Sequence, residues 1–248
     1  MKKNLLFACL LLFAFSCKKK DNHTETNQTN MGSVLMRTET NNGITYRLFL
    51  DDAQSNYKGI VVMGSGNDEN NPSPGSLDGA AETTFCEKAA QNGYVAAIVQ
   101  YRKTSGVADW NNSSLFVAAD YDKCIQALSA LYHVDKSKSV VGGFSYAAFM
   151  LLTDIAIDNT LAYTRGVLAP CGATGQWSAQ HFIIPVYSIA CSGNNEGDFS
   201  GKELYDQIPN DAAVKGASEG VTDNSCSTHC GGDWSLPMYN KLIQWIPG

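Results

Sequence analysis

The sequence predicts a single doubly wound α/β domain, in which helices cover both faces of a mostly parallel sheet. Short, continuously apolar segments alternate with longer segments that have helical periodicity. Loops rich in glycine, asparagine and serine follow several of the apolar segments, and no internal repeat is apparent. Parallel strands that are buried on both faces read as continuous apolar runs. The length of 248 residues suits one domain of this kind.

Each element is expected from its local pattern. Strands are expected where apolar and β-branched residues run without interruption, at residues 44–50, 58–64, 94–102, 139–144, 164–170, 184–190 and 213–218. Helices are expected where apolar residues recur at spacings of three and four, at residues 76–91, 114–132, 146–157, 202–208 and 236–245. The connections are too short to hold a large lid.

The composition is that of a globular protein without an affinity for nucleic acid. Hydrophobic residues make up 44% of the chain and charged residues 17%. The net charge is −6, and no basic patch interrupts this acidic balance. Proteins that bind nucleic acid present clustered lysine and arginine, so nucleic acid is not an expected partner.

Residues 1–17 have the pattern of a signal peptide. Two lysines precede an apolar run from Leu5 to Phe15, which is too short to span a membrane. The end of this segment resembles a bacterial lipobox, which implies that Cys17 becomes the lipidated first residue. Ala14 stands where leucine is usual, so ordinary signal-peptidase cleavage remains an alternative. We therefore expect an exported protein, lipid-anchored to the cell envelope or secreted, with a polar flexible linker at residues 18–33 and a folded domain at residues 34–248.

The segment around Ser145 is a candidate nucleophile elbow. Gly143-Phe144-Ser145-Tyr146-Ala147 follows a predicted strand and opens a predicted helix. A serine on so tight a turn points its hydroxyl out of the sheet, and the next backbone N–H faces the same space. The alternative is that Ser145 only caps the helix. Ala147 stands where this motif usually has glycine.

A serine nucleophile needs a base and a carboxylate that orients the base. His229 lies in a loop of small residues before the last helix, where this chemistry places its base. The loop after residues 184–190 supplies Glu196 and Asp198, and Glu196 is preferred because Gly193 aligns it with a G-x-x-D pattern. A zinc site at Cys226, His229 and Cys230 is less favoured, because no second ligand pair is evident.

Two N–H donors are needed to stabilise the developing negative charge. The backbone of Tyr146 is expected to supply one. The other is expected from the turn Gly64-Ser65-Gly66-Asn67 after a predicted strand, where Ser65 and Gly66 are both candidates. An ordinary glycine turn is the alternative interpretation.

Together these residues resemble the α/β-hydrolase superfamily, and within it the small lidless dienelactone hydrolases and cutinase-type polyester hydrolases. The resemblance runs from about Lys58 to Ile246 and is carried by the motifs GFSYA, GSGN, CSGNNEG and TRGVLAP. It implies hydrolysis of a small or polymeric ester through an acyl-serine, without a metal or an organic cofactor. The chain departs from the family in Ala147, in its glutamate acid and in having no histidine before the GSGN turn.

Of eight cysteines, two lie in the signal segment, which leaves six in the exported chain (8 − 2). The fold implied by the resemblance puts Cys171 and Cys191 at the ends of neighbouring strands, within bridging distance. Cys226 and Cys230 flank His229 and are expected to lock its loop. Cys86 and Cys124 are expected to be buried free thiols, because that fold places their helices on opposite faces of the sheet.

Two other functions fit the same pattern. A serine peptidase would use the same three residues, and a noncatalytic surface-binding lipoprotein would keep the fold with an unreactive Ser145. Trp110, Trp177 and Trp234 are either the rim of an acyl pocket or partly buried loop anchors.

Overall fold

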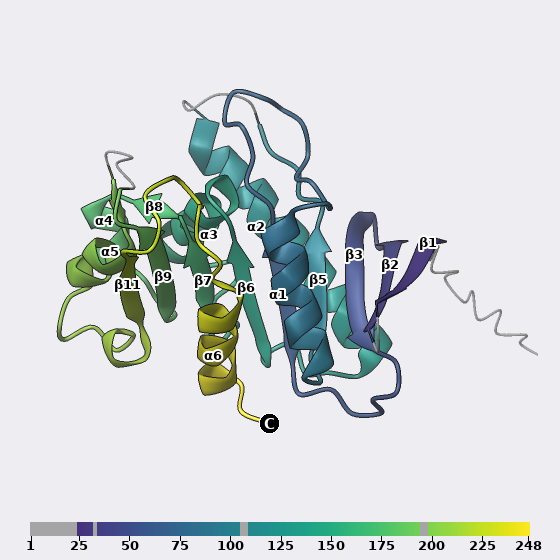
Figure 1. Ribbon diagram of the computed structural model, residues 1–248. Helices are drawn as coiled ribbons and strands as arrows, with labels where there is room; N and C mark the ends of the chain where they lie inside the picture. The colour runs from purple at the N-terminus through teal and green to yellow at the C-terminus, as the bar shows by residue number, and fades with distance from the viewer. Residues whose placement is uncertain (1–23, 32–33, 105–108, 194–197) are drawn as a thin grey trace, which may run out of the picture.

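The computed structural model describes residues 24–31, 34–104, 109–193 and 198–248 (Figure 1). Its main sheet has nine strands in the order β1-β2-β3-β5-β4-β6-β7-β9-β11. The strands from β5 to β11 in this order are parallel, and β1, β2 and β3 extend the sheet with antiparallel pairing. This is the α/β-hydrolase fold, as the resemblance predicted.

The strands of the main sheet are β1 (Thr24–Met31), β2 (Val34–Asn41), β3 (Ile44–Asp51), β4 (Ile60–Gly64), β5 (Val95–Val99), β6 (Ser139–Gly143), β7 (Val167–Pro170), β9 (Val186–Cys191) and β11 (Glu219–Asp223). A small second sheet pairs β8 (Ala173–Thr174) with β10 (Phe199–Ser200). The helices are α1 (Ala80–Gln91), α2 (Trp110–Tyr132), α3 (Tyr146–Ile157), α4 (Gln176–Gln180), α5 (Gly201–Gln207) and α6 (Ser235–Trp245), with a 3-10 turn η2 (Lys215–Ala217).

The helices form two layers that enclose the parallel strands. In Figure 1, α1 and α6 lie in front of the sheet, and α2 and α3 lie behind it. Side chains alternate between the two layers, so that in β4 Val62 packs towards α2 and α3 while Met63 packs towards α1 and α6. Every residue of β4, β5 and β6 is buried. Because these strands are buried on both faces, they could be recognised in the sequence as uninterrupted apolar runs.

Cys86 and Cys124 confirm the prediction of two free thiols. Cys86 lies on α1 and Cys124 on α2, in separate cores on opposite faces of the sheet. Both thiols are fully buried, and burial raises the pKa of each because a thiolate would lose its hydration. They therefore behave as small apolar side chains.

The strand predicted at residues 213–218 is wrong. That segment contains the 3-10 turn η2, and the strand is β11, which begins at Glu219. β11 is a polar strand at the edge of the sheet and lacks the apolar run that marks the central strands. Gly220 lets it approach α5, because a Cβ there would overlap Tyr205 Cβ. Packing against α5 and pairing with β9 therefore define this strand.

The segment predicted as a flexible linker, residues 18–33, contains strand β1, which pairs with β2. An edge strand is held by backbone hydrogen bonds to one neighbour and does not need apolar side chains. The sequence TETNQTNM therefore gave no apolar alternation to reveal it. Helix starts also shifted: α1 begins at Ala80 and α2 at Trp110, against predicted starts at residues 76 and 114.

Candidate active site

Ser145 occupies a strained turn between β6 and α3. Its φ is 50° and its ψ is −115°, a backbone conformation that residues other than glycine rarely adopt. Its side chain makes no capping hydrogen bond to α3. The helix-cap interpretation therefore does not explain this serine, and the turn has the form of a nucleophile elbow.

Ala147 fits the elbow because Gly143 has no side chain. A Cβ placed on Gly143 would lie 2.5 Å from the Cβ of Ala147, well inside van der Waals contact. The next residue, Ala148, packs in the same way against Gly172, where an added Cβ would overlap the Cβ of Ala148. The methyl group that departs from the usual motif is thus accommodated, and α3 still approaches the end of β6 closely.

His229 lies beside Ser145, as the sequence predicted. Its Nε2 is 2.8 Å from Ser145 Oγ, within hydrogen-bond distance. His229 belongs to the exposed loop between β11 and α6, 84 residues further along the chain. The fold therefore joins the two residue types that nucleophilic catalysis requires in direct contact.

Two disulfides hold the histidine loop, and their pairing differs from the pairing we expected. Cys171 is bonded to Cys230, and Cys191 to Cys226, with Cα atoms 5.1 and 5.0 Å apart. The bridge expected between Cys171 and Cys191 is therefore wrong, although the four cysteines involved were identified. The histidine loop crosses the ends of β7 and β9, and each strand end pairs with the loop instead of with its neighbour.

The disulfides also argue against a zinc site. Ligand atoms of Cys171, His229 and Cys230 lie within 4.8 Å of one another, but the two sulfurs are bonded together. Zinc takes cysteine as thiolate, which a disulfide does not offer. Disulfides are also typical of proteins that work outside the reducing cytoplasm. Within the described residues, no helix combines the length and apolar character that a membrane-spanning helix requires.

The loop that carries the two candidate acids starts against the histidine loop. Ser192 N–H donates to the Asp223 carbonyl at 2.9 Å, and Ser192 Oγ donates to the Cys226 carbonyl at 3.3 Å. Glu196 lies outside the described residues. Asp198 is exposed and lines the cavity that contains Ser145. The choice between Glu196 and Asp198 stays a prediction.

A cavity of about 470 Å³ opens beside Ser145. Its wall divides into an aromatic part and a polar part. The aromatic part comprises Trp110, Tyr146 and Phe149, and the rings of Trp110 and Phe149 meet edge to face at 4.6 Å. The polar part comprises Asn67, Asp68, Glu69, Asn70 and Asp198. The cavity therefore offers an apolar surface beside Ser145 and a carboxylate-rich rim.

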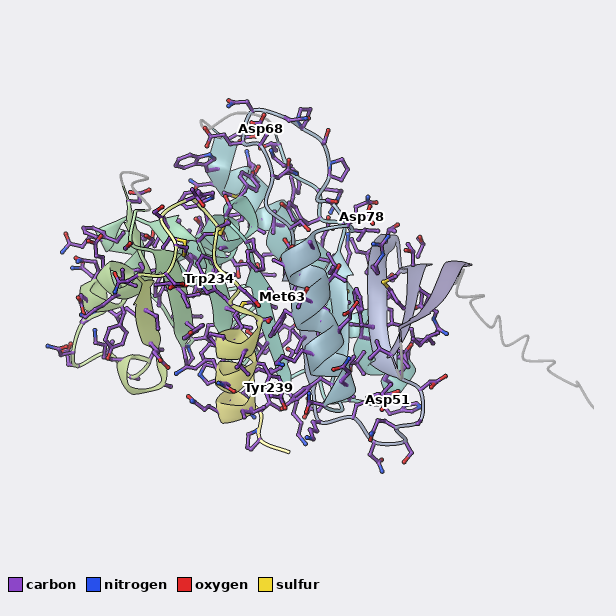
Figure 2. All side chains as sticks on the ribbon, viewed as in Figure 1. Asp51, Met63, Asp68, Asp78, Trp234 and Tyr239 are labelled. Atoms are coloured by element: carbon purple, nitrogen blue, oxygen red, sulfur yellow. A yellow bond between two sulfur atoms is a disulfide. The ribbon has the colours of Figure 1, made fainter. Side chains whose placement is uncertain are left out.

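The three tryptophans considered for the rim of a pocket lie in different surroundings. Trp110 lines the cavity, whereas Trp177 is exposed on α4 and stacks on His181 with ring centroids 4.1 Å apart. Trp234 is buried where the histidine loop meets α6 (Figure 2). Its Nε1 donates to Asp223 at 2.8 Å, and hydrogen bonds from Ser225 and from Trp234 hold the pKa of Asp223 below its usual range. Trp234 is thus an anchor of the loop and not part of the cavity wall.

The turn expected to supply an oxyanion donor lies beside Ser145. A Cβ added to Gly66 would contact Ser145 Cβ at 3.4 Å, and Ser65 is buried just before it. Asn67, which the sequence interpretation did not single out, is the member of this turn that lines the cavity. Figure 2 shows Asp68 further along the same loop, beyond the ends of the central strands.

Lys103 supports this loop and gave no signal in the sequence. It is buried, its Nζ donates to the Asp68 carbonyl, and it lies 4.4 Å from the centre of the Tyr146 ring. Burial lowers its pKa, while the charges of Asp68 and Glu69 oppose that shift. A single lysine in a loop after a strand is indistinguishable in sequence from a solvated one.

No protein-family model matches the sequence, and no curated protein matches it either. Three-dimensional comparison finds a glucuronoyl esterase from Solibacter usitatus (TM-score 0.59, 12% identity), with 93% of this chain and 87% of that one aligned. A protein designated a dienelactone hydrolase, from Klebsiella pneumoniae, is similar at a TM-score of 0.56 and 12% identity, over 90% and 97% of the two chains.

Dipeptidyl peptidase 4 from Porphyromonas gingivalis is similar at a TM-score of 0.56 and 14% identity. The alignment covers 91% of this chain but only 35% of that protein. At these identities the comparisons establish the α/β-hydrolase fold, and structures named as esterases and as a peptidase share it. Function must therefore be argued from the residues of the site.

Proposed function

We propose that this protein is an exported serine hydrolase that cleaves carboxylic esters through an acyl-serine intermediate. The observation that carries the proposal is the 2.8 Å contact between His229 Nε2 and Ser145 Oγ at a strained strand-to-helix turn. Backbone strain of this kind is maintained where a side chain must be presented in one orientation.

In the proposed reaction, Ser145 Oγ attacks the ester carbonyl carbon while His229 Nε2 takes the hydroxyl proton. The tetrahedral intermediate collapses when His229 returns that proton to the leaving alkoxide, which departs as the alcohol. Water then attacks the acyl-serine carbonyl while His229 takes its proton. The second tetrahedral intermediate collapses as its bond to Ser145 Oγ breaks and His229 returns that proton to Oγ, which releases the carboxylic acid. Glu196 orients His229, with Asp198 as the alternative acid.

The negative charge of the intermediate is held by two backbone N–H groups. Tyr146 N–H supplies one, and the turn at Ser65 and Gly66 supplies the other. The aromatic wall beside Ser145 accommodates an apolar part of a small or polymeric ester.

The same proposal places the protein at the bacterial cell envelope. Cys17 carries the lipid that anchors the chain, or ordinary cleavage releases a secreted form. The two disulfides agree with export. Radiolabelled palmitate should enter the wild-type protein and not Cys17→Ser, and labelling of both would contradict an anchor at Cys17.

The reaction is tested with a fluorophosphonate probe and short-chain p-nitrophenyl esters. The probe should label Ser145 in the folded protein, and Ser145→Ala should lose about 10⁵- to 10⁶-fold in kcat. Aminoacyl p-nitroanilides assayed in parallel distinguish an esterase from a peptidase. Ester hydrolysis by Ser145→Ala at the wild-type rate would overturn the proposal, and an unlabelled wild type would favour a noncatalytic binding protein.

A further inference from the structure

The segment after β5 holds the loop after β4, which forms part of the cavity wall. Tyr101 is fully buried, and its hydroxyl donates to the Ser65 carbonyl at 2.6 Å. The Lys103 ammonium donates to the Asp68 carbonyl. Gly75 N–H donates to the Tyr101 carbonyl at 2.8 Å. The loop after β4 is therefore attached to this segment at its start, in its middle and at its end.

The segment after β5 is itself fixed to α2. Arg102 donates to both carboxylate oxygens of Asp120, at 2.8 and 2.7 Å, and Asp120 is buried. Thr104 N–H donates to Ser113 Oγ on the same helix at 2.9 Å. Lys103 therefore projects from a backbone that is anchored on both sides of it.

Lys103 contacts both parts of the cavity wall from behind. Its Nζ donates to the Asp68 carbonyl in the polar part and lies 4.4 Å from the centre of the Tyr146 ring in the aromatic part. Lys103 is only 7% exposed and is not among the described residues that line the cavity. An ammonium combines several N–H donors with an attraction to aromatic faces, which is stronger where water is excluded. Lys103 thus links the polar part of the wall to the aromatic part.

A buried lysine can also serve the fold alone, and Lys241 provides the comparison. Lys241 is buried on α6, and its Nζ lies 3.0 Å from Glu219 Oε2 and 5.7 Å from the centre of the Trp245 ring. Glu219 begins β11, so this contact lies at the opposite end of the parallel strands from Ser145, which follows the end of β6. The two lysines share burial, an oxygen partner and an aromatic ring. They differ because the partners of Lys103 line the cavity and those of Lys241 do not.

We propose that Lys103 is a positioning residue that determines specificity, because it fixes the distance between the polar and aromatic walls of the cavity beside Ser145. The inference rests on the proposed ester hydrolysis and assigns the part of the site that selects esters by chain length. An ester chain that fills the cavity lies between the two walls, whereas an acetyl group occupies only the space next to Ser145. Loss of the link should therefore weaken the binding of long esters and leave the reaction at the carbonyl unchanged.

The first test measures kcat and KM of Lys103→Met and Lys103→Arg on two series of esters. One series is p-nitrophenyl acetate to octanoate, and the other is methyl acetate to hexyl acetate, so either orientation of the ester in the cavity is covered. Methionine has neither a charge nor an N–H donor, so in at least one series KM for the longest ester that wild type cleaves should rise about tenfold. The kcat for that ester should stay within about threefold of wild type, and KM for the shortest ester should change by less than about twofold. Arginine keeps the cation and the donors and should restore most of the binding.

Two further variants control for folding. Lys241→Met is the matched control, because it removes a buried lysine with similar partners away from the cavity. It should lower the melting temperature and leave the ratio of KM values for long and short esters unchanged. Lys103→Gln provides the same test if Lys103→Met does not fold. Its amide keeps an N–H donor without the charge, so KM for the long ester should rise about threefold.

The second test asks whether Lys103 acts through the Tyr146 ring. Tyr146→Leu removes that ring and keeps the backbone N–H that the proposed reaction uses. In the Tyr146→Leu background, Lys103→Met should raise KM for the long ester by less than about threefold, because the ring that Lys103 holds is already absent. An undiminished tenfold rise would show that the link to the aromatic wall is not what selects the ester.

The remaining outcomes separate specificity from a structural role. An equal change of KM for every chain length, or a loss confined to kcat, would overturn the proposal. Unchanged KM values in the folded neutral variants, with only a lower melting temperature as in Lys241→Met, would also overturn it. So would failure of both Lys103→Met and Lys103→Gln to fold while Lys103→Arg folds, because Lys103 would then serve the fold. Failure of the ester-hydrolase assignment is recognised separately, because wild type would then cleave no ester and the fluorophosphonate probe would not label Ser145.

Discussion

The two side chains of the proposed catalytic dyad, Ser145 and His229, are held in place by different means. Ser145 follows β6, whose residues are all buried between β4 and β7, so hydrophobic packing from both faces fixes its position. His229 lies in an exposed loop that two disulfides connect to the ends of β7 and β9. Ser145 is thus held by packing in the core, whereas His229 is held by covalent cross-links. The two halves should therefore respond differently to substitution.

The cross-links of the loop are not equivalent. Cys230 is adjacent to His229 and is bonded to Cys171, which itself lines the cavity. Cys226 is three residues away from His229 and is bonded to the buried end of β9. We therefore expect the Cys171–Cys230 bridge to control the histidine, and the Cys191–Cys226 bridge to control the path of the loop.

The largest expected effect is on activity and comes from His229. His229→Ala should lower kcat for p-nitrophenyl butyrate by about 10⁴- to 10⁶-fold, because Ser145 loses the base in contact with it. The side chain is exposed, so the melting temperature should change little. Loss of fluorophosphonate labelling at Ser145 is the accompanying measurement. Labelling at the wild-type rate would show that the 2.8 Å contact does not activate the serine.

The next effect distinguishes the two disulfides. Replacing Cys171 and Cys230 together by serine should lower kcat roughly 10- to 100-fold, because a displacement of His229 near 1 Å is enough for such a loss. The same change should reduce the free energy of unfolding by about 2 to 4 kcal/mol.

Cys191→Ser with Cys226→Ser is the matched control for this prediction. A similar loss of stability with a much smaller loss of kcat is expected, because this bridge does not adjoin His229. Equal losses of kcat in the two double variants would show that the loop moves as one unit. Urea unfolding, monitored by circular dichroism, measures the free energy of unfolding of each double variant.

How much of this arrangement was predictable depends on how local each signal is. The elbow at Ser145 could be predicted from the local sequence, because a strand, a glycine and the start of a helix lie within a few residues of one another. His229 was identified because it is the histidine of a small-residue loop before the last helix. The disulfide pairing was not predictable, because it depends on where the histidine loop crosses two strand ends that are far away in sequence. Lys103 was missed because a single buried charge has no pattern.

The strand predictions divide on the same principle. Central strands such as β4 and β6 can be recognised in the sequence, because residues that are buried on both faces form a continuous apolar run. The edge strands β1 and β11 are polar and depend on pairing with one neighbour, so their residues carry no comparable signal. Val214 is the only large apolar residue of the segment 213–218, and the prediction there mistook one buried anchor for a strand.

The close packing of α3 against β6 at the turn that carries Ser145 should make stability sensitive to one added methyl group. Gly143→Ala should reduce the free energy of unfolding by about 1 to 3 kcal/mol, because its Cβ would overlap that of Ala147. The double variant Gly143→Ala with Ala147→Gly exchanges the two positions and should recover most of the loss. If Gly143→Ala alone unfolds at the wild-type urea concentration, the close approach of α3 to β6 is not what holds the elbow.

The smallest expected effect concerns the strain at Ser145 itself. Ser145→Gly and Ser145→Ala both remove the nucleophile, but only glycine adopts a positive φ without steric conflict. Ser145→Gly should therefore unfold with about 1 kcal/mol more free energy than Ser145→Ala, a difference reduced by the larger entropy of glycine in the unfolded chain. Paired urea titrations of the two inactive variants measure this difference directly. A more stable Ser145→Ala would mean that the packing of β6 and α3 imposes no strain on the turn, and that the serine is presented without conformational energy stored in the backbone.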